Sequence, residues 1–184
     1  MHARELCGIR VKVQGQVEPG SYAHIVMLMY ADDVVLMAHD VLVLHEMLRT
    51  LDKVAAEFGM KINASKTEIQ VMGGAPEGMP TLMLSTGQVK VTDVFKYLGS
   101  WTQQDGGMDR EIAMRRNAAL GVFHSFGKVW CNKKLRVSHK MAVYNSFVLP
   151  HFLYGCEAWN CQSAQLSILE TAHRYCLRHI MVWT

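Results

Sequence analysis

The sequence predicts an α+β fold in which an antiparallel sheet with a packed helix comes first and a helical region follows. Short apolar runs rich in β-branched residues dominate the chain up to about residue 100, whereas from residue 109 onward apolar residues recur at three- and four-residue steps. Gly106 and Gly107 mark the change of period. With 184 residues, half of them hydrophobic, the chain is long enough to bury a core.

The first elements are strands, expected at residues 9–13, 25–29 and 34–38. The second and third strands flank the sequence Tyr30-Ala31-Asp32-Asp33, which predicts a β-hairpin with two carboxylates at its tip. A helix is expected next, because Asp40 can cap its start, apolar residues recur through residues 41–58, and Gly59 stands where a helix ends.

Further short strands are expected at residues 67–72, 81–84, 88–91 and 94–98, with a glycine- and proline-rich loop after the first of them. Helices follow, at residues 109–130, 138–149 and 163–181. Asp109 is the expected cap of the first helix, and Pro150 is expected to end the second. The predicted organisation is therefore two regions, residues 1–106 and residues 107–184.

Charge is unevenly distributed along the chain. Residues 1–108 carry nine basic and twelve acidic side chains, a balance of −3, whereas residues 109–184 carry ten and four, a balance of +6. This pattern indicates a polyanion partner, with a solvated basic helix face as the equal alternative. No apolar run is long enough for a membrane span, so we expect an intracellular protein that is not secreted. The five cysteines show no CxxC spacing, and we expect them to be reduced thiols.

The paired aspartates suggest a metal site. Adjacent carboxylates repel each other, and a divalent cation compensates that repulsion. Hard oxygen ligands favour Mg²⁺, which takes one or two protein carboxylates and completes its shell with water and phosphate oxygens. Turns also favour aspartate for its side-chain hydrogen bonds, so the pair alone does not establish a metal site.

Several segments in order carry a family resemblance. The string MYADDVVL at residues 29–36 resembles motif C of reverse transcriptases, and FGMKINASKTE at residues 58–68 resembles motif D in the form typical of non-LTR (LINE-like) retrotransposons. FKYLGS at residues 95–100 resembles motif E, the primer grip. Four further segments resemble the thumb of the same elements: VLP at residues 148–150, LYG at 153–155, EAW at 157–159 and LR at 177–178. The resemblance implies part of a polymerase palm in residues 1–106 and a truncated helical thumb in residues 107–184.

The resemblance also implies an activity, RNA-directed DNA synthesis by two-metal nucleotidyl transfer. Its cofactor would be Mg²⁺, with Mn²⁺ as the alternative ion, and its partners an RNA template, a DNA primer duplex and deoxynucleoside triphosphates. Asp32 would be the metal-binding aspartate and Asp33 its supporting neighbour, with Tyr30 and Ala31 near the primer end. Lys66 falls on the lysine of motif D that protonates the departing pyrophosphate, although a solvated lysine at the start of a strand is nearly as good an interpretation.

Other residues would contact nucleic acid. Tyr97, Leu98 and Gly99 match the primer grip, although simple alternation in a strand would also explain Tyr97 and Leu98. A predicted basic face would meet the phosphates of an RNA–DNA duplex through Arg115, Arg116, Lys128, Lys133, Lys134, Arg136 and Lys140. Trp130 lies among them but completes an apolar stripe, so we expect it in the core.

The cysteines and histidines near the C-terminus offer another possible metal site. A zinc site is a weaker alternative use of Cys156, Cys161, His173, Cys176 and His179, because their spacing is not that of a common zinc finger.

The motif A aspartate and motif B of the family do not appear upstream of Ile25, so we expect the chain to be inactive as a polymerase on its own. Members of the family act in the cytoplasm and nucleus. A non-catalytic nucleic-acid-binding remnant and a decayed retroelement reading frame are the alternatives.

Overall fold

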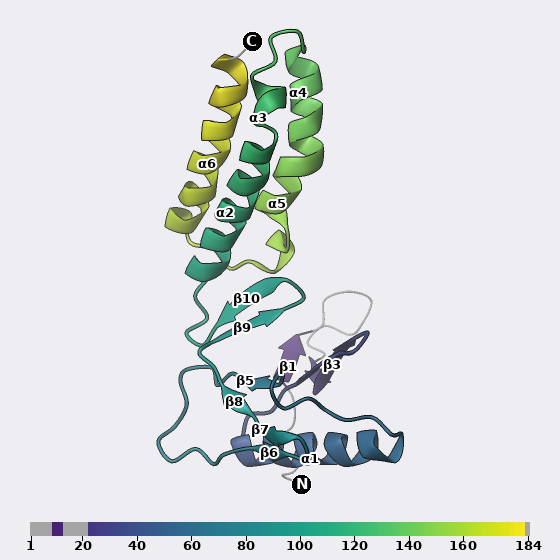
Figure 1. The fold of residues 1–184 in the computed structure, drawn as a ribbon. Helices are drawn as coiled ribbons and strands as arrows, with labels where there is room; N and C mark the ends of the chain where they lie inside the picture. The colour runs from purple at the N-terminus through teal and green to yellow at the C-terminus, as the bar shows by residue number, and fades with distance from the viewer. Residues whose placement is uncertain (1–8, 13–21, 183–184) are drawn as a thin grey trace. The chain divides into compact units, whose positions relative to one another are not determined.

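The computed structural model describes residues 9–12 and 22–182, which form two compact units. Unit 1 comprises the described residues up to Ile69 together with residues 75–92, and unit 2 comprises residues 70–74 and 93–182. Helices and short, mostly antiparallel strands share the chain, as the α+β prediction requires (Figure 1). Val13, the last residue of the first expected strand, lies outside the described residues, as does Cys7.

Unit 1 contains the first eight strands and one long helix. Two antiparallel hairpins come first, β1 (Ile9–Lys12) with β2 (Tyr22–Ile25) and β3 (Met27–Tyr30) with β4 (Asp33–Leu36). Helix α1 (Val41–Glu57) follows. The remaining strands are two residues long: β5 (Glu68–Ile69) pairs parallel with β8 (Lys90–Val91), and β6 (Met83–Leu84) pairs antiparallel with β7 (Gly87–Gln88). The longer strands expected at residues 67–72, 81–84 and 88–91 are thus wrong in extent.

Helix α1 is held in unit 1 at its start and along one side. Its predicted cap is confirmed, because Asp40 Oδ1 accepts hydrogen bonds from Leu42 N at 2.7 Å and Val43 N at 3.2 Å. In the middle of the helix, Asp52 accepts from the backbone N and the hydroxyl of Ser85 at 2.9 and 3.0 Å. The turn between β6 and β7 is therefore bound to α1. The small core of unit 1 includes Leu48, Ala55, Ala64, Ile69, Leu82, Leu84 and Val89.

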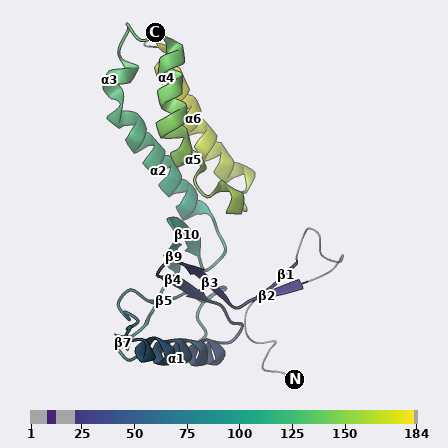
Figure 2. The ribbon, with the colours of Figure 1, turned by 90° about the vertical axis from the view of Figure 1, so that its right-hand side faces the viewer.

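Unit 2 is a hairpin followed by a helical bundle (Figures 1 and 2). Strands β9 (Val94–Tyr97) and β10 (Ser100–Gln103) pair antiparallel, and β10 was not expected from the sequence. The helices are α2 (Asp109–Ser125), α3 (Gly127–Trp130), α4 (Val137–Val143), α5 (Leu149–Leu153) and α6 (Ser163–Val182). A π-helical turn (Tyr144–Val148) joins α4 to α5, and a 3₁₀ turn (Cys156–Ala158) precedes α6.

Three helix boundaries differ from the prediction. The first helix ends at Ser125 and resumes as the short α3 after Phe126, and its cap is Met108 while Asp109 lies in its first turn. The second continues through Pro150 to Leu153. Proline lacks an N–H and its ring collides with the carbonyl four residues earlier. The π-helical turn immediately before it widens the helix at that point, which lets the chain pass Pro150 without stopping.

The bundle core is built around stacked aromatic rings. Phe123 and Trp130 lie nearly parallel with ring centroids 5.0 Å apart, and both are buried. Trp130 Nε1 donates to Phe123 O at 2.6 Å, so the polar atom of the indole is satisfied where α2 gives way to α3. The expectation that Trp130 belongs to the core is confirmed. None of the helices in the described part of the chain is both long and apolar enough to cross a membrane.

We expect Phe123→Ala to destabilise unit 2 by about 3–5 kcal/mol, because it removes a buried ring and leaves a cavity beside Trp130. Phe147→Ala is the matched control, since Phe147 is 53% exposed, and its loss should be well below that range. Urea unfolding followed by circular dichroism measures both. Equal losses would contradict the packing described for Phe123.

The cysteines of unit 2 should differ in reactivity. Cys131 and Cys156 are exposed, whereas Cys176 is fully buried and burial raises its pKa to about 11. The thiolate is the nucleophile, so at neutral pH an alkylating reagent should modify Cys131 and Cys156 quickly in the folded chain and Cys176 only after unfolding. Mass spectrometry of the peptides reads each cysteine separately. Rapid alkylation of Cys176 in the folded chain would refute the burial.

Candidate active site and nucleic-acid interface

The predicted aspartate hairpin is present in unit 1. Tyr30 pairs with Asp33, so Ala31 and Asp32 form a two-residue loop. Ala31 has φ +53 and Asp32 has no positive φ, and a positive φ at the first loop residue alone is the pattern of a type II′ turn. Both aspartates are exposed, and no described residue donates a hydrogen bond or an ion pair to either carboxylate. The described residues therefore leave both carboxylates open to a ligand.

The donor set at this tip suits part of a magnesium site. Mg²⁺ uses one or two protein carboxylates together with water and phosphate oxygens, which is what Asp32 and Asp33 can provide. Within residues 9–12 and 22–182 no group of three or more histidine, cysteine, aspartate or glutamate side chains could hold an ion. The aspartates thus fit as one component of a shared site, and the zinc alternative gains no support from the described cysteines and histidines.

The strands that carry the aspartates expose apolar side chains on both faces. Met29 and Tyr30 are each 64% exposed, and Met27, Leu28 and Val34 are exposed as well. Successive residues of a strand point to opposite faces, so the described part of the chain covers neither face of this hairpin. A two-stranded hairpin with apolar faces is marginal by itself in water. The exposed side chains of this hairpin are therefore of the apolar kind that is usually buried inside a sheet.

Lys66 is exposed on a turn whose backbone is fixed. Asn63 Oδ1 accepts from the backbone N of Ser65 at 3.0 Å and from its hydroxyl at 2.7 Å, and Thr67 N donates to Asn63 O at 3.0 Å. The neighbouring Ala64 N donates to Thr86 Oγ1 at 3.0 Å. Among the described residues Lys66 forms no ion pair with Asp32 or Asp33, so its ammonium group is held on a rigid turn without a carboxylate partner there.

The predicted primer-grip residues form the second hairpin turn, in unit 2. Tyr97 pairs with Ser100, which leaves Leu98 and Gly99 as the loop, with φ +46 and +85. Left-handed angles at both loop residues define a type I′ turn, a conformation that disfavours leucine. The turn must therefore be supported from outside.

That support comes from the helices of unit 2. Tyr154 Oη donates to Leu98 O at 2.7 Å, and Arg115 Nη2 donates to Gly99 O at 2.5 Å. Arg115 also lies over the Tyr154 ring, 4.5 Å from its centroid. Arg115 Nε bonds Glu111 Oε1 at 2.6 Å, while Glu111 Oε2 accepts from Trp101 N at 2.7 Å. The sequence interpretation gave Glu111 no role, and it included Tyr154 only as part of the LYG segment that resembles the thumb. The only signal for Glu111 was a glutamate four residues before an arginine on a predicted helix.

The seven basic residues expected on one face lie in three places. Arg115 and Arg116 are on α2, near the hairpin, and the Arg115 side chain is only 12% exposed and bound within the fold. Lys140 is fully buried and donates to Trp130 O at 2.7 Å. The exposed ones cluster on α3 and the segment leading to α4, at the opposite end of the bundle from the hairpin (Figure 1): Lys128, Lys133, Lys134 and Arg136. The expectation of a single phosphate-binding face is corrected accordingly, without Lys140 and Arg115.

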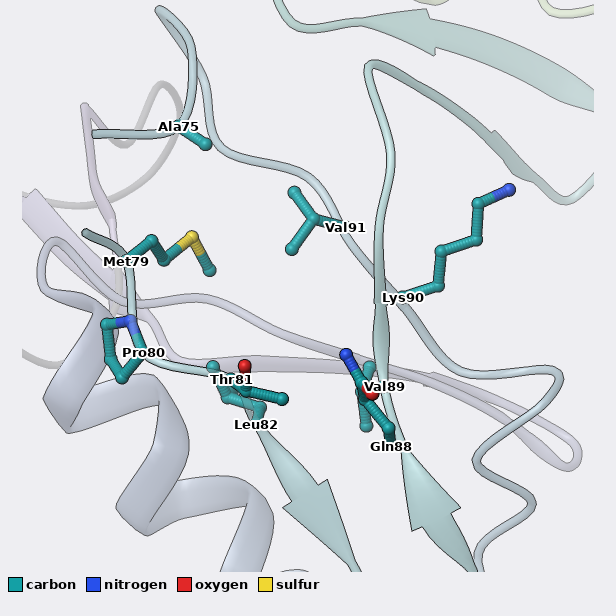
Figure 3. Close-up of a pocket in the computed structure, with 9 residues that line it drawn as sticks. All are labelled: Ala75, Met79, Pro80, Thr81, Leu82, Gln88, Val89, Lys90 and Val91. Carbon is teal, nitrogen blue, oxygen red and sulfur yellow. The ribbon is translucent and has the colours of Figure 1, made fainter. Parts of the chain in front are cut away.

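An open groove in unit 1 contains none of the predicted residues. It lies over β6, β7 and β8 and is lined mainly by apolar side chains such as Met79, Leu82 and Val91 (Figure 3). Lys90 is its only charged residue, and its Nζ lies 3.9 Å from Glu68 Oε1. Its described lining therefore contains no carboxylate, histidine or cysteine for catalysis.

Comparison with known proteins identifies a family. The chain is 30% identical, over an alignment of 158 residues, to an uncharacterized transposon-derived protein of Caenorhabditis elegans, and the alignment covers 79% of this chain and 53% of that protein. The chain thus spans about half the length of that relative. No solved structure gives a significant match. The family model for reverse transcriptase (RNA-dependent DNA polymerase) matches residues 8–102, a segment that includes both hairpin turns. Because this match covers more than half of the 184 residues, the chain belongs to the reverse transcriptase family.

Proposed function

We propose that the chain is the C-terminal palm and the beginning of the thumb of a reverse transcriptase from a non-LTR retrotransposon. Its part in the activity is RNA-directed DNA synthesis on a primer paired to an RNA template. The observation that carries this proposal is the hairpin tip, where two adjacent exposed aspartates lie between apolar strands, within the segment that the family model matches.

Each predicted residue has a role in this proposal. The carboxylates of Asp32 and Asp33 supply the protein ligands of Mg²⁺, which when bound lowers the barrier to phosphoryl transfer by neutralising charge on phosphate oxygens. The ammonium of Lys66 donates a proton to the departing pyrophosphate, a role that suits an exposed lysine on a fixed turn. The turn at Leu98 and Gly99 holds the primer end through its backbone.

We also propose that the chain does not polymerise on its own. Two-metal transfer needs a further carboxylate near the aspartate pair, and no described residue provides one. The exposed apolar faces of β3 and β4 support the same conclusion, because the hairpin needs further structure to hold its tip in place.

A second candidate function is nucleic-acid binding without catalysis. It is favoured by the sequence between Ile112 and Cys156, which contains seven lysines and arginines and no aspartate or glutamate. Four of these cations are exposed at one end of the bundle. A surface with cations and no carboxylates attracts the phosphates of a nucleic acid without distinguishing its bases.

The catalytic proposal predicts no primer extension by the purified chain with Mg²⁺, deoxynucleotides and an RNA template. A fusion that supplies the motif A and motif B segments of a related element should extend the primer. In that fusion Asp32→Asn should lower the rate at least about a hundredfold, because a metal ligand contributes several kcal/mol to the transition state. Asp33→Asn should have a smaller effect. Equal losses would contradict the separate roles of the two aspartates.

The binding proposal predicts a salt dependence. Each phosphate contact releases counterions, so Lys133→Ala/Lys134→Ala should lower the log–log salt slope of binding to an RNA–DNA hybrid by about two. Lys53→Ala/Lys61→Ala removes the same charge from exposed positions of unit 1 and should leave the slope unchanged. Fluorescence anisotropy at several salt concentrations measures the slopes, with circular dichroism to verify folding. The same slope in both double variants would show that the basic end is only solvated.

A further inference from the structure

The turn at Leu98 and Gly99 has both of its carbonyl oxygens bound by side chains from the bundle. Leu98 O accepts from Tyr154, which follows α5, and Gly99 O accepts from Arg115 in α2. The backbone N–H groups of these two loop residues have no partner within the described part of the chain. The side of the turn that can still form hydrogen bonds therefore consists of donors, which suit a phosphate or another anionic oxygen.

The approach of the helices to this turn is close enough to require glycine at two points. A Cβ added at Gly99 would lie 3.2 Å from Tyr154 Oη, and one added at Gly155 would lie 2.9 Å from Ser100 Oγ. Both glycines also have left-handed φ angles, +85 and +75. The hairpin and the segment after α5 thus fit together through main chain as well as side chains.

Burial distinguishes the ion pair at this turn from an ordinary surface pair. The Glu111 and Arg115 side chains are 1% and 12% exposed, whereas the corresponding i,i+4 pair on α6, Glu170 with Arg174, is 58% and 57% exposed. A surface pair contributes little to structure, because water and salt compete for its charges. The buried pair leaves each group few alternatives, so its orientation is fixed by the hydrogen bonds to Trp101 N and Gly99 O.

We infer that Glu111, Arg115 and Tyr154 are positioning residues of the primer grip. By binding both carbonyls of the turn and the backbone N of Trp101 in β10, they hold a strained loop in the single conformation that presents its N–H groups to the primer end. This inference rests on the proposed function, since it assigns these three side chains to the same hairpin. They act through the turn and do not themselves contact the primer.

The test uses the full chain and an RNA–DNA hybrid with a photoreactive 4-thiothymidine at the primer 3′ end. Irradiation should crosslink the wild-type chain within residues 94–103, as mapped by mass spectrometry. Tyr154→Phe, which removes only the hydroxyl, and Arg115→Lys, which keeps the charge, should each lower this crosslink roughly three- to tenfold, the change that one net hydrogen bond represents. The dissociation constant of the hybrid should stay within about twofold, because the basic end of the bundle is unaltered.

Two control variants match these changes. Tyr175→Phe removes the hydroxyl of a half-exposed tyrosine on α6, and Arg174→Lys alters the exposed ion pair, so neither should change the crosslink. Circular dichroism verifies folding, and if Arg115→Lys unfolds, Tyr154→Phe decides the result. A wild-type chain that binds the hybrid without crosslinking at the hairpin would refute the primer-grip role in the proposed function, and the inference with it. Wild-type crosslinking that persists unchanged in Tyr154→Phe would overturn the inference alone.

Discussion

The buried carboxylate of Glu111 is the constraint on which the architecture of unit 2 depends. A charge that is 1% exposed must be compensated within the fold, and here Arg115 and the backbone of Trp101 supply the compensation. One of these partners lies on the same helix and the other on β10. The hairpin and α2 are consequently fixed to each other, since separating them would break the hydrogen bonds from Trp101 N to Glu111 and from Arg115 to Gly99 O, which orient the buried pair. Removing one partner of such a pair typically costs about 3–5 kcal/mol, far more than the loss of a surface pair.

Charge is unevenly distributed along unit 2. Its acidic residues lie toward the hairpin, at the start of α2 or in the first half of α6: Asp93, Asp105, Asp109, Glu111, Glu157 and Glu170. Asp109 and Glu111 occupy the first turn of α2, where carboxylates interact favourably with the helix dipole. Carboxylates near the hairpin repel phosphates, so contact with nucleic acid there has to rely on backbone N–H groups held in a fixed geometry. At the other end, exposed cations without carboxylates attract phosphates over a longer range. In the proposed function, the primer is positioned at one end of the bundle and nucleic acid is attracted at the other.

The sequence predicted what is encoded locally and missed what depends on contacts between distant segments. The aspartate hairpin, the Asp40 cap and the main helices follow from short apolar periods and capping residues, which is why they were correct. Strand β10 and the Leu98–Gly99 support depend on Glu111 and Tyr154, and the bond from Tyr154 spans 56 residues. Lys140 was expected among phosphate contacts because it neighbours other cations in sequence, yet one helical face turns it into the core. A charge count cannot show which face a lysine occupies. The helix that passes Pro150 shows the same limit, since a local stop signal was overcome by a π-helical turn.

The two units differ in how firmly the described residues hold the hairpin to which the proposal assigns a function. Unit 2 buries Phe123, Trp130 and Tyr144 completely or nearly so, and its hairpin is supported on several sides. In unit 1 the aspartates lie at the turn between β3 and β4, strands with exposed apolar side chains and with outer edges that no other described strand pairs. Catalysis requires ligand geometry held within a fraction of an ångström, which an uncovered two-stranded hairpin does not provide. Binding to phosphates tolerates much looser geometry, because it depends mainly on charge. The nucleic-acid binding proposed for unit 2 therefore makes far smaller structural demands than polymerisation does.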